Sequence, residues 1–263
     1  MKPNRVKKTL EAGETVIGTM ISEVRNAEIA YILAASGMDF LMLDMEHSSV
    51  DLESSQEIVR AALSAGIVPL ARVVENQYPF IARILDTGVM GIMVPRVHTP
   101  DQARQVVRAA KYPPQGDRGF GVRGMITDYA PVSMREIIDW ANDHTLLIIQ
   151  VESNEALTNL DEITSVQGID VALIGPSDLS ISLGIPGEFE NPRFLEAAEH
   201  TFRVCLRNGV SPSIFSVDLK MAKQYQNLGM KFILYTTESG MLRTAATQAV
   251  EQLRSTLPKT KEG

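Results

Sequence analysis

The chain has 263 residues, of which 44% are hydrophobic and 22% are charged. This composition is typical of a globular protein with a large core, and it excludes the disordered and fibrous classes. The formal net charge of -7 repels phosphate backbones, so we expect no nucleic-acid partner. A single cysteine, Cys205, excludes an intrachain disulfide and a cysteine-based zinc site.

The N-terminal residues contain no secretion signal that we can identify. They are basic up to Lys8 and then continue through Glu11 and Glu14 without an apolar stretch. No later run approaches the roughly 18 apolar residues of a membrane span. We therefore expect a cytoplasmic protein with no membrane partner, in which residues 1–15 form an N-terminal extension.

Short aliphatic runs recur along the chain, and each is followed by a turn and a helix-period segment. This alternation is typical of parallel βαβ units, and runs such as LLIIQ and VALIG indicate strands that are buried on both faces. The predicted strands are Val16–Met20, Phe40–Leu43, Val68–Ala71, Gly91–Val94, Leu146–Gln150, Val171–Ile174, Pro212–Phe215 and Phe232–Tyr235. Eight such strands predict an α/β fold, a single (β/α)8 TIM barrel over residues 1–263.

The segments between these strands predict the outer helices. SSQEIVRAALSAG and PDQARQVVRAAKY carry apolar residues at i, i+3, i+4 and i+7. No linker divides the chain, and the one long irregular stretch, KYPPQGDRGFGVRGMITDYAP, lies between the fourth and fifth strands. An open doubly wound sheet is the main alternative fold, but its glycine-rich turn after the first strand is missing, since TMISEVRN stands there.

Polar side chains follow several predicted strands, where a barrel of this class places its active site. The residues concerned are Asp44, Glu46, His47, Arg72, Gln150, Glu152, Ser177 and Asp178. Glu152 and Asp178 follow neighbouring strands, so both carboxylates are candidate ligands of a hard cation such as Mg2+ or Mn2+. Each alone is equally well explained as a helix N-terminal residue. The backbone N–H groups of Ser177 and Asp178 are candidates for binding a carboxylate.

Three further residues are candidates for proton transfer and charge stabilisation. His47 lies close in sequence to two acids and suits a general base, although a structural loop histidine is the more common case. Arg72 ends an apolar strand, where a guanidinium can stabilise a developing enolate or alkoxide, and a surface ion pair is the alternative. Asp86 is a candidate for orienting His47, and a capping role at the end of its helix is about as plausible.

Two absences narrow the chemistry. No lysine follows any predicted strand, so an imine mechanism is disfavoured. The turns after the last two strands read IFSVD and YTTESG rather than a glycine-rich phosphate site, so we expect an unphosphorylated substrate.

The motifs LDMEH, LAR, ILDTG, KYPPQGDRG, QVES and IGPSDL, in this order and spacing, resemble the HpcH/HpaI family of class II, metal-dependent pyruvate aldolases. The resemblance runs from about Gly18 to the last helix. It implies a phosphoenolpyruvate/pyruvate-type barrel that cleaves 4-hydroxy-2-oxo acids, such as 2-keto-3-deoxy sugar acids or 2,4-dihydroxy-hept-2-ene-1,7-dioate, to pyruvate and an aldehyde. Mg2+, Mn2+ or Co2+ is the implied cofactor.

The resemblance also implies roles for individual residues. Glu152 and Asp178 would bind the metal, His47 paired with Asp86 would be the base, and Arg72 would stabilise the enolate oxygen. Further residues would bind substrate or support His47, and they are Gln150, Ser177, Phe215, Asp44 and Glu46.

A hexamer that exchanges the C-terminal helix, residues 239–258, between subunits is implied as well. The sequence departs from the family pattern at Met45, Phe215, Thr236 and Glu238, which leaves the aldehyde undefined. Arg118 and Arg123 either contact the far end of the aldehyde or lie in a solvated loop.

Other activities also use a stabilised enolate. An oxaloacetate decarboxylase and a lyase of the malyl-CoA or citryl-CoA type are the nearest alternatives, and a non-catalytic barrel is the alternative outside the enzymes.

Overall fold

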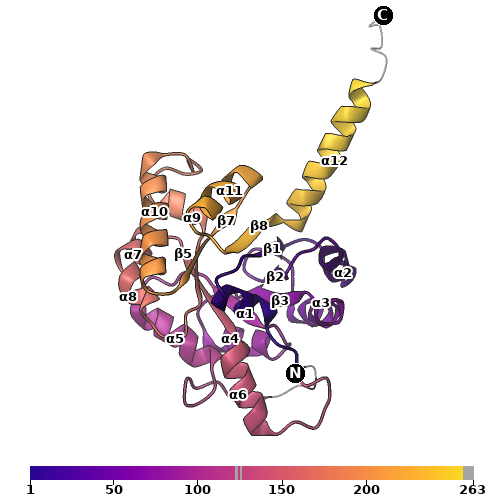
Figure 1. Cartoon of the computed structure of the whole chain (residues 1–263), viewed down its shortest axis with the longest axis vertical. Coiled ribbons are helices and arrows are strands. Elements are labelled where there is room, and N and C mark those ends of the chain that lie inside the picture. Colours follow the sequence, from indigo (N-terminus) through magenta and orange to yellow (C-terminus); the bar gives the residue numbers. More distant parts are fainter. Residues whose placement is uncertain (122–123, 125, 257–263) are drawn as a thin grey trace, which may run out of the picture.

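Eight parallel strands form a closed barrel in the computed structural model, which describes residues 1–121, 124 and 126–256 (Figure 1). Neighbouring strands follow chain order around the barrel. They are β1 (Val16–Ile21), β2 (Phe40–Asp44), β3 (Val68–Arg72), β4 (Gly91–Val94), β5 (Leu146–Val151), β6 (Val171–Ile174), β7 (Ser211–Ser216) and β8 (Phe232–Thr237). The predicted (β/α)8 TIM barrel is confirmed.

Helices surround the barrel and connect successive strands. Within the described residues they are α1 (Arg5–Glu11), α2 (Glu28–Ala35), α3 (Leu52–Ala65), α4 (Tyr78–Leu85), α5 (Pro100–Ala110), α6 (Met134–His144), α7 (Asn154–Thr158), α8 (Leu160–Thr164), α9 (Pro176–Ser182), α10 (Pro192–Arg207), α11 (Leu219–Asn227) and α12 (Glu238–Ser255). α3, α5 and α6 each begin with a capping box, which satisfies otherwise unpaired N–H groups of the first turn.

The strands alternate between two apolar cores. Phe40 and Met42 point into the barrel, and Phe40 stacks on Phe232 with ring centroids 4.4 Å apart. Leu41 and Leu43 of the same strand belong to the core between the barrel and its helices. Because both faces of each strand are covered, near-continuous apolar runs are required, and this is the pattern that the sequence carries.

Two strands extend past their apolar runs into charged residues. β2 includes Asp44 and β3 includes Arg72, and these two residues are register partners. The carboxyl ends of parallel strands share one rim of the barrel, so this register places an acid and an arginine side by side at the mouth.

The N-terminal extension closes the opposite end of the barrel. Asn4 is fully buried and donates from Nδ2 to the carbonyls of Met90 and His144, both at 2.8 Å. Lys7 pairs with Asp170 at 2.7 Å. These contacts come from loops that precede β4, β5 and β6, so α1 is fastened to the end of the barrel that lies away from the mouth.

α12 is the exception to the compact arrangement. It projects from the barrel at the end of β8 (Figure 1), and of its residues only Glu238 is buried. In the part of the chain that the structure describes, no helix combines the length and apolar character needed to cross a membrane.

Candidate active site

A pocket of about 250 Å³ opens at the carboxyl ends of the strands. Its floor is the top of the inner core, formed by Met20, Met93, Leu173 and Leu234. The polar and remaining residues that line it are Asp44, His47, Arg72, Gln150, Gly175, Pro176, Ser177, Asp178, Phe215 and Thr237. The predicted site residues Asp44, His47, Arg72, Gln150, Ser177, Asp178 and Phe215 therefore lie around one cavity.

Arg72 is held as a rigid fork by Asp44. Its Nε donates to Asp44 Oδ1 at 2.9 Å, and its Nη2 donates to Asp44 Oδ2 at 2.7 Å. Burial alone would raise the pKa of Asp44, but the hydrogen bonds and the charge of Arg72 hold that pKa below its usual value. A bidentate pair fixes the guanidinium plane more strictly than a single contact, so Arg72 presents its remaining N–H groups in a fixed direction.

Glu46 is a buried carboxylate shared by two arginines. Its Oε2 lies 3.2 Å from Arg72 Nη1, and its Oε1 lies 3.0 Å from Arg96 Nη2. Burial raises the pKa of Glu46, and the positive charges of Arg72, His47 and Arg96 oppose that rise. Asp44 and Glu46 thus pair with arginines as well as lying beside His47, the place that the family resemblance implied for them.

His47 lies at the open side of the pocket, with 59% of its side chain exposed. The Asp44 carboxylate accepts the backbone N–H of Glu46 at 3.0 Å and that of His47 at 3.3 Å, which fixes the turn after β2. His47 Nε2 lies 3.7 Å from Glu46 Oε1. An exposed imidazole with one free edge at a pocket mouth is suited to exchange protons with a bound molecule.

Glu152 follows β5 and is buried against the turn after β4. Its Oε1 accepts the backbone N–H of Arg96 at 2.7 Å. Burial raises the pKa of Glu152 to about 7, and the negative charges of Asp178 and Glu46 add to the rise while the Arg96 hydrogen bond opposes it. A cation stabilises a buried carboxylate that lies close to other acids, so the position beside Glu152 favours a bound cation.

Gln150 and Gly175 complete the same corner. The Gln150 Oε1 atom is buried, lines the pocket and has no hydrogen-bond partner among the described residues. A Cβ at Gly175 would lie 2.7 Å from Gln150 Nε2 and 3.1 Å from Glu152 Oε2. Because Gly175 has no side chain, Gln150 and Glu152 can approach the start of α9. Asp178 lies in the first turn of that helix.

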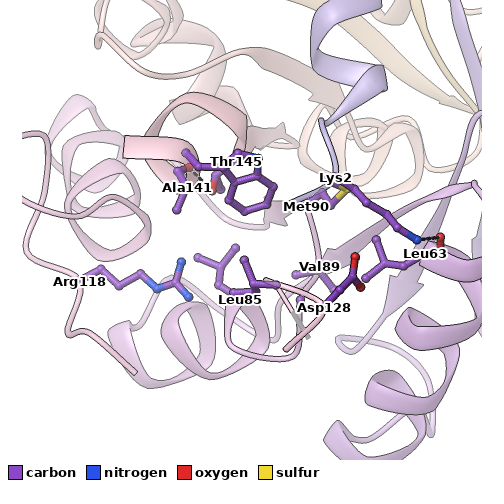
Figure 2. A pocket seen from close by; sticks show the side chains of 12 residues that line it. Lys2, Leu63, Leu85, Val89, Met90, Arg118, Asp128, Ala141 and Thr145 are labelled. Carbon is purple, nitrogen blue, oxygen red and sulfur yellow. Dashed lines mark hydrogen bonds between the residues drawn. The ribbon is translucent and has the colours of Figure 1, made fainter. Parts of the chain in front are cut away.

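Asp86 lies away from this pocket within one chain. It follows α4 at the C-cap position and pairs with Arg118 at 2.7 Å, and no hydrogen bond or ion pair between Asp86 and His47 is found in the described residues. Arg118 is buried, stacks over Tyr112 and lines a separate pocket of about 30 Å³ beside Leu85 and Met90 (Figure 2).

This placement corrects both readings of Arg118, which is neither a solvated loop residue nor a lining residue of the mouth in this chain. Arg123 lies outside the described residues, as do residues 257 and 258 at the end of the predicted C-terminal segment. Asp86 stands at the end of its helix, but its carboxylate pairs with Arg118 and makes no capping hydrogen bond among the described residues. Orientation of His47 would require an Asp86 from a second chain.

Two contributors were not predicted from the sequence. Arg96 is the first polar residue after β4, two positions past its end, and reading the polar residue after that strand would have found it. Glu238 is buried, and its carboxylate accepts the backbone N–H groups of Ser22, Glu23 and Val24 at 2.6 to 3.1 Å. It fastens the loop after β1 to the start of α12, beside the lining residue Thr237.

The comparison with known proteins agrees with this geometry. Residues 19–245 match the family model described as HpcH/HpaI aldolase/citrate lyase. The chain belongs to this family. Its HpcH/HpaI relatives include the 2-keto-3-deoxy-L-rhamnonate aldolase of Escherichia coli O157:H7, which is 36% identical over 259 residues, covering 96% of this chain and 94% of the relative.

Two further relatives are similar over nearly their whole length. The hydroxypyruvate/pyruvate aldolase of Cupriavidus necator is 34% identical and covers 95% of this chain and 93% of the relative. The crystal structure of an HpcH/HpaI aldolase from Desulfitobacterium hafniense DCB-2 has a TM-score of 0.91 at 34% identity, covering 97% of this chain and 98% of the other. The family resemblance drawn from the motifs is confirmed.

Proposed function

We propose that this HpcH/HpaI protein is a divalent-metal-dependent aldolase that cleaves a 4-hydroxy-2-oxo acid to pyruvate and an aldehyde. The observation that carries the proposal is a pocket lined by Asp178 and the fixed guanidinium of Arg72, with the buried carboxylate of Glu152 directly behind the lining residue Gly175. Carbon-carbon cleavage beside a keto group leaves an enolate, so a site for this reaction must stabilise negative charge on an oxygen.

The residues present fit a divalent cation such as Mg2+, Mn2+ or Co2+. Glu152 and Asp178 would hold it, because carboxylate oxygens are the ligands such ions take. The raised pKa of Glu152 shows that burial disfavours its negative charge, and Gln150 Oε1 is buried with no hydrogen-bond partner among the described residues. When bound, the cation supplies Lewis-acid polarisation of the keto oxygen.

The protein side chains have separate tasks in this proposal. Arg72 uses three of its five N–H groups on Asp44 and Glu46, and the remaining two face the oxygen on which negative charge develops. His47 accepts the proton of the C4 hydroxyl as the C3–C4 bond breaks, and returns a proton to the enolate carbon. Ser177 and Asp178, at the start of α9, hold the substrate carboxylate through backbone N–H groups.

The aldehyde half of the substrate is expected on the apolar side of the pocket. Met20, Phe215 and Leu234 line that side together with Thr237. No lysine lines the pocket among the described residues, so imine formation with substrate has no candidate nucleophile there. These side chains suit an unphosphorylated aldehyde of modest size.

The oxaloacetate decarboxylase and the CoA-ester lyase share the enolate and remain the alternatives to test. The relatives from Escherichia coli O157:H7 and Cupriavidus necator are both named aldolases, which supports the aldolase. A CoA ester needs a basic site for its phosphates near the mouth, and the Arg118 side chain is buried against Asp86, away from the pocket.

Proton exchange at the methyl group of pyruvate in D2O, followed by proton NMR with Mg2+, tests the proposal without knowledge of the aldehyde. We expect exchange that stops with EDTA and in Glu152→Ala, followed by retro-aldol activity on 2-keto-3-deoxy acids. Absence of exchange in Mg2+-loaded protein would reject the aldolase and leave the CoA-ester lyase, to be assayed with malyl-CoA, or the non-catalytic barrel.

A further inference from the structure

Arg96 contacts two acids at the mouth, Glu46 and Glu152. It follows β4 with φ +56°, a backbone conformation that non-glycine residues seldom adopt and that often occurs at functional sites. Its backbone N–H binds Glu152, while its guanidinium reaches Glu46 at 3.0 Å. One residue thus contacts the expected metal ligand through its backbone and a neighbouring acid through its charge.

The side chain of Arg96 is much more accessible than the acid it neutralises. The Arg96 side chain is 58% exposed, whereas that of Glu46 is 5% exposed. Arg72 already contacts the other oxygen of Glu46 at 3.2 Å and also neutralises Asp44. Because Arg72 is shared between two carboxylates, Arg96 supplies the second positive charge that the pair requires.

The charges around the mouth can be counted from these contacts. Counted at their formal charges, the groups are the four carboxylates of Asp44, Glu46, Glu152 and Asp178 and the two guanidinium groups of Arg72 and Arg96. A divalent cation brings the count to zero. Without Arg96 the loaded mouth would keep one negative charge and would repel an anionic keto acid.

We propose that Arg96 is a specificity-determining residue that sets the net charge of the metal-loaded mouth. Its positive charge slightly lowers the affinity for the cation and raises the affinity for the keto-acid anion. The proposal rests on the metal site of the proposed function. It requires opposite effects on two ligands, because removal of a positive charge attracts a cation and repels an anion. A residue that merely supports the fold would weaken both.

Arg96→Met tests this sign directly. Methionine keeps the unbranched chain and the backbone N–H that binds Glu152, and it removes the positive charge together with the contact to Glu46. We expect the Kd for Mn2+, measured by electron paramagnetic resonance of the free ion, to fall about fivefold, and the Kd for pyruvate at saturating Mn2+, measured by calorimetry, to rise about fivefold. Both shifts should shrink in about 0.5 M KCl, since an exposed charge is screened.

Two matched variants separate a local charge from a general one. Arg96→Lys retains the charge and should stay within about twofold of the wild type for both ligands. Arg104→Met removes an equal charge from the exposed Arg104–Asp101 pair on α5 and should change neither Kd. Thermal melts of each variant report whether the fold is kept.

The outcomes are distinguishable. Tighter Mn2+ and weaker pyruvate in Arg96→Met alone would support the proposal. Weakening of both ligands, or no change in either, would overturn it while leaving the aldolase proposal in place. Failure of the wild-type protein to bind Mn2+ at all would overturn both.

Discussion

At the scale of single residues, the mouth depends on the geometry of one guanidinium. Arg72→Lys keeps the positive charge but removes the two-pronged contact with Asp44 at 2.9 and 2.7 Å. Loss of one donor to a developing oxyanion typically reduces turnover by a factor of about 100. We therefore expect kcat of Arg72→Lys to fall about 100-fold in retro-aldol assays, with little change in KM.

The matched control for this prediction is Arg108→Lys. Arg108 pairs with Asp117 on the surface, so its substitution should leave kcat within about twofold. Turnover of Arg72→Lys close to that of the wild type would contradict the role of Arg72, provided that circular dichroism shows both variants folded.

Glu152 makes the stability of the metal-free protein depend on pH. Its pKa of about 7 in the fold exceeds the unfolded value of about 4.3. Protonated Glu152 therefore contributes to the free energy of unfolding. That contribution is fully present below about pH 4.3 and is lost as the pH rises through 7, because the folded protein then holds a buried negative charge. At pH 8 the loss amounts to at most about 4 kcal/mol, so Glu152→Gln should be more stable than the wild type in EDTA.

Thermal melts of both proteins in EDTA at pH 5 and pH 8 measure this difference. The two melting temperatures should nearly coincide at pH 5 and separate at pH 8. Added Mg2+ should raise that of the wild type at pH 8 and leave that of Glu152→Gln unchanged. A separation that is the same at both pH values would show that Glu152 is not the titrating group.

At the scale of elements, the end of the barrel opposite the mouth is held by a short helix. Asn4 caps α1 through its Oδ1 and binds two carbonyls through its Nδ2, while fully buried. Asn4→Ala would leave these groups unpaired, at a cost of about 3 kcal/mol. We expect the melting temperature to fall by about 6 °C or more, with kcat and KM unchanged at 25 °C because the mouth lies at the other end.

Asn191→Ala provides a control of the same chemistry. Asn191 caps α10 at the surface, and its loss should cost about 1 kcal/mol. Equal effects of the two substitutions on the melting temperature would contradict the special role of the buried Asn4.

The strands and most of the mouth followed from the sequence, because burial on both faces leaves continuous apolar runs and the first polar residue after each run marks the rim. Asp44 and Arg72 were found in this way. Their pairing was not, since register between strands is a property of the closed barrel. Arg96 is also the first polar residue after its strand, but its positive φ and its contact with Glu46 leave no sequence pattern, so the sequence does not reveal what it does.

Asp86 shows the opposite failure. Its motif indicated a partner for His47, but within one chain it ends α4 beside Arg118. The motif identifies Asp86 but not its neighbours. Those depend on how α4 packs against the barrel and on whether a second chain covers the end of this helix.

At the scale of the whole molecule, α12 contacts the barrel only near its N-terminal end, and its later apolar side chains are exposed. Leu242 is 70% exposed and Leu253 is 68% exposed on a helix that projects from the barrel (Figure 1). Such apolar side chains on an extended helix are typical of an interaction surface. The structure therefore supports, as a prediction, the homo-oligomer with exchanged C-terminal helices that the motifs implied.

Light scattering coupled to size exclusion tests this prediction. We expect the wild type to elute as a single species at six times the mass of the chain, and Leu242→Glu combined with Leu253→Glu to dissociate it, because each would bury a carboxylate at the contact. Gln248→Glu combined with Gln252→Glu adds the same charge to the same helix without removing an apolar side chain, and should keep the large species. If the double leucine variant keeps the wild-type mass, α12 does not hold the assembly together. If the wild type is itself a single chain, no neighbouring chain can bring its Asp86 to His47, and His47 must act with the residues of its own chain.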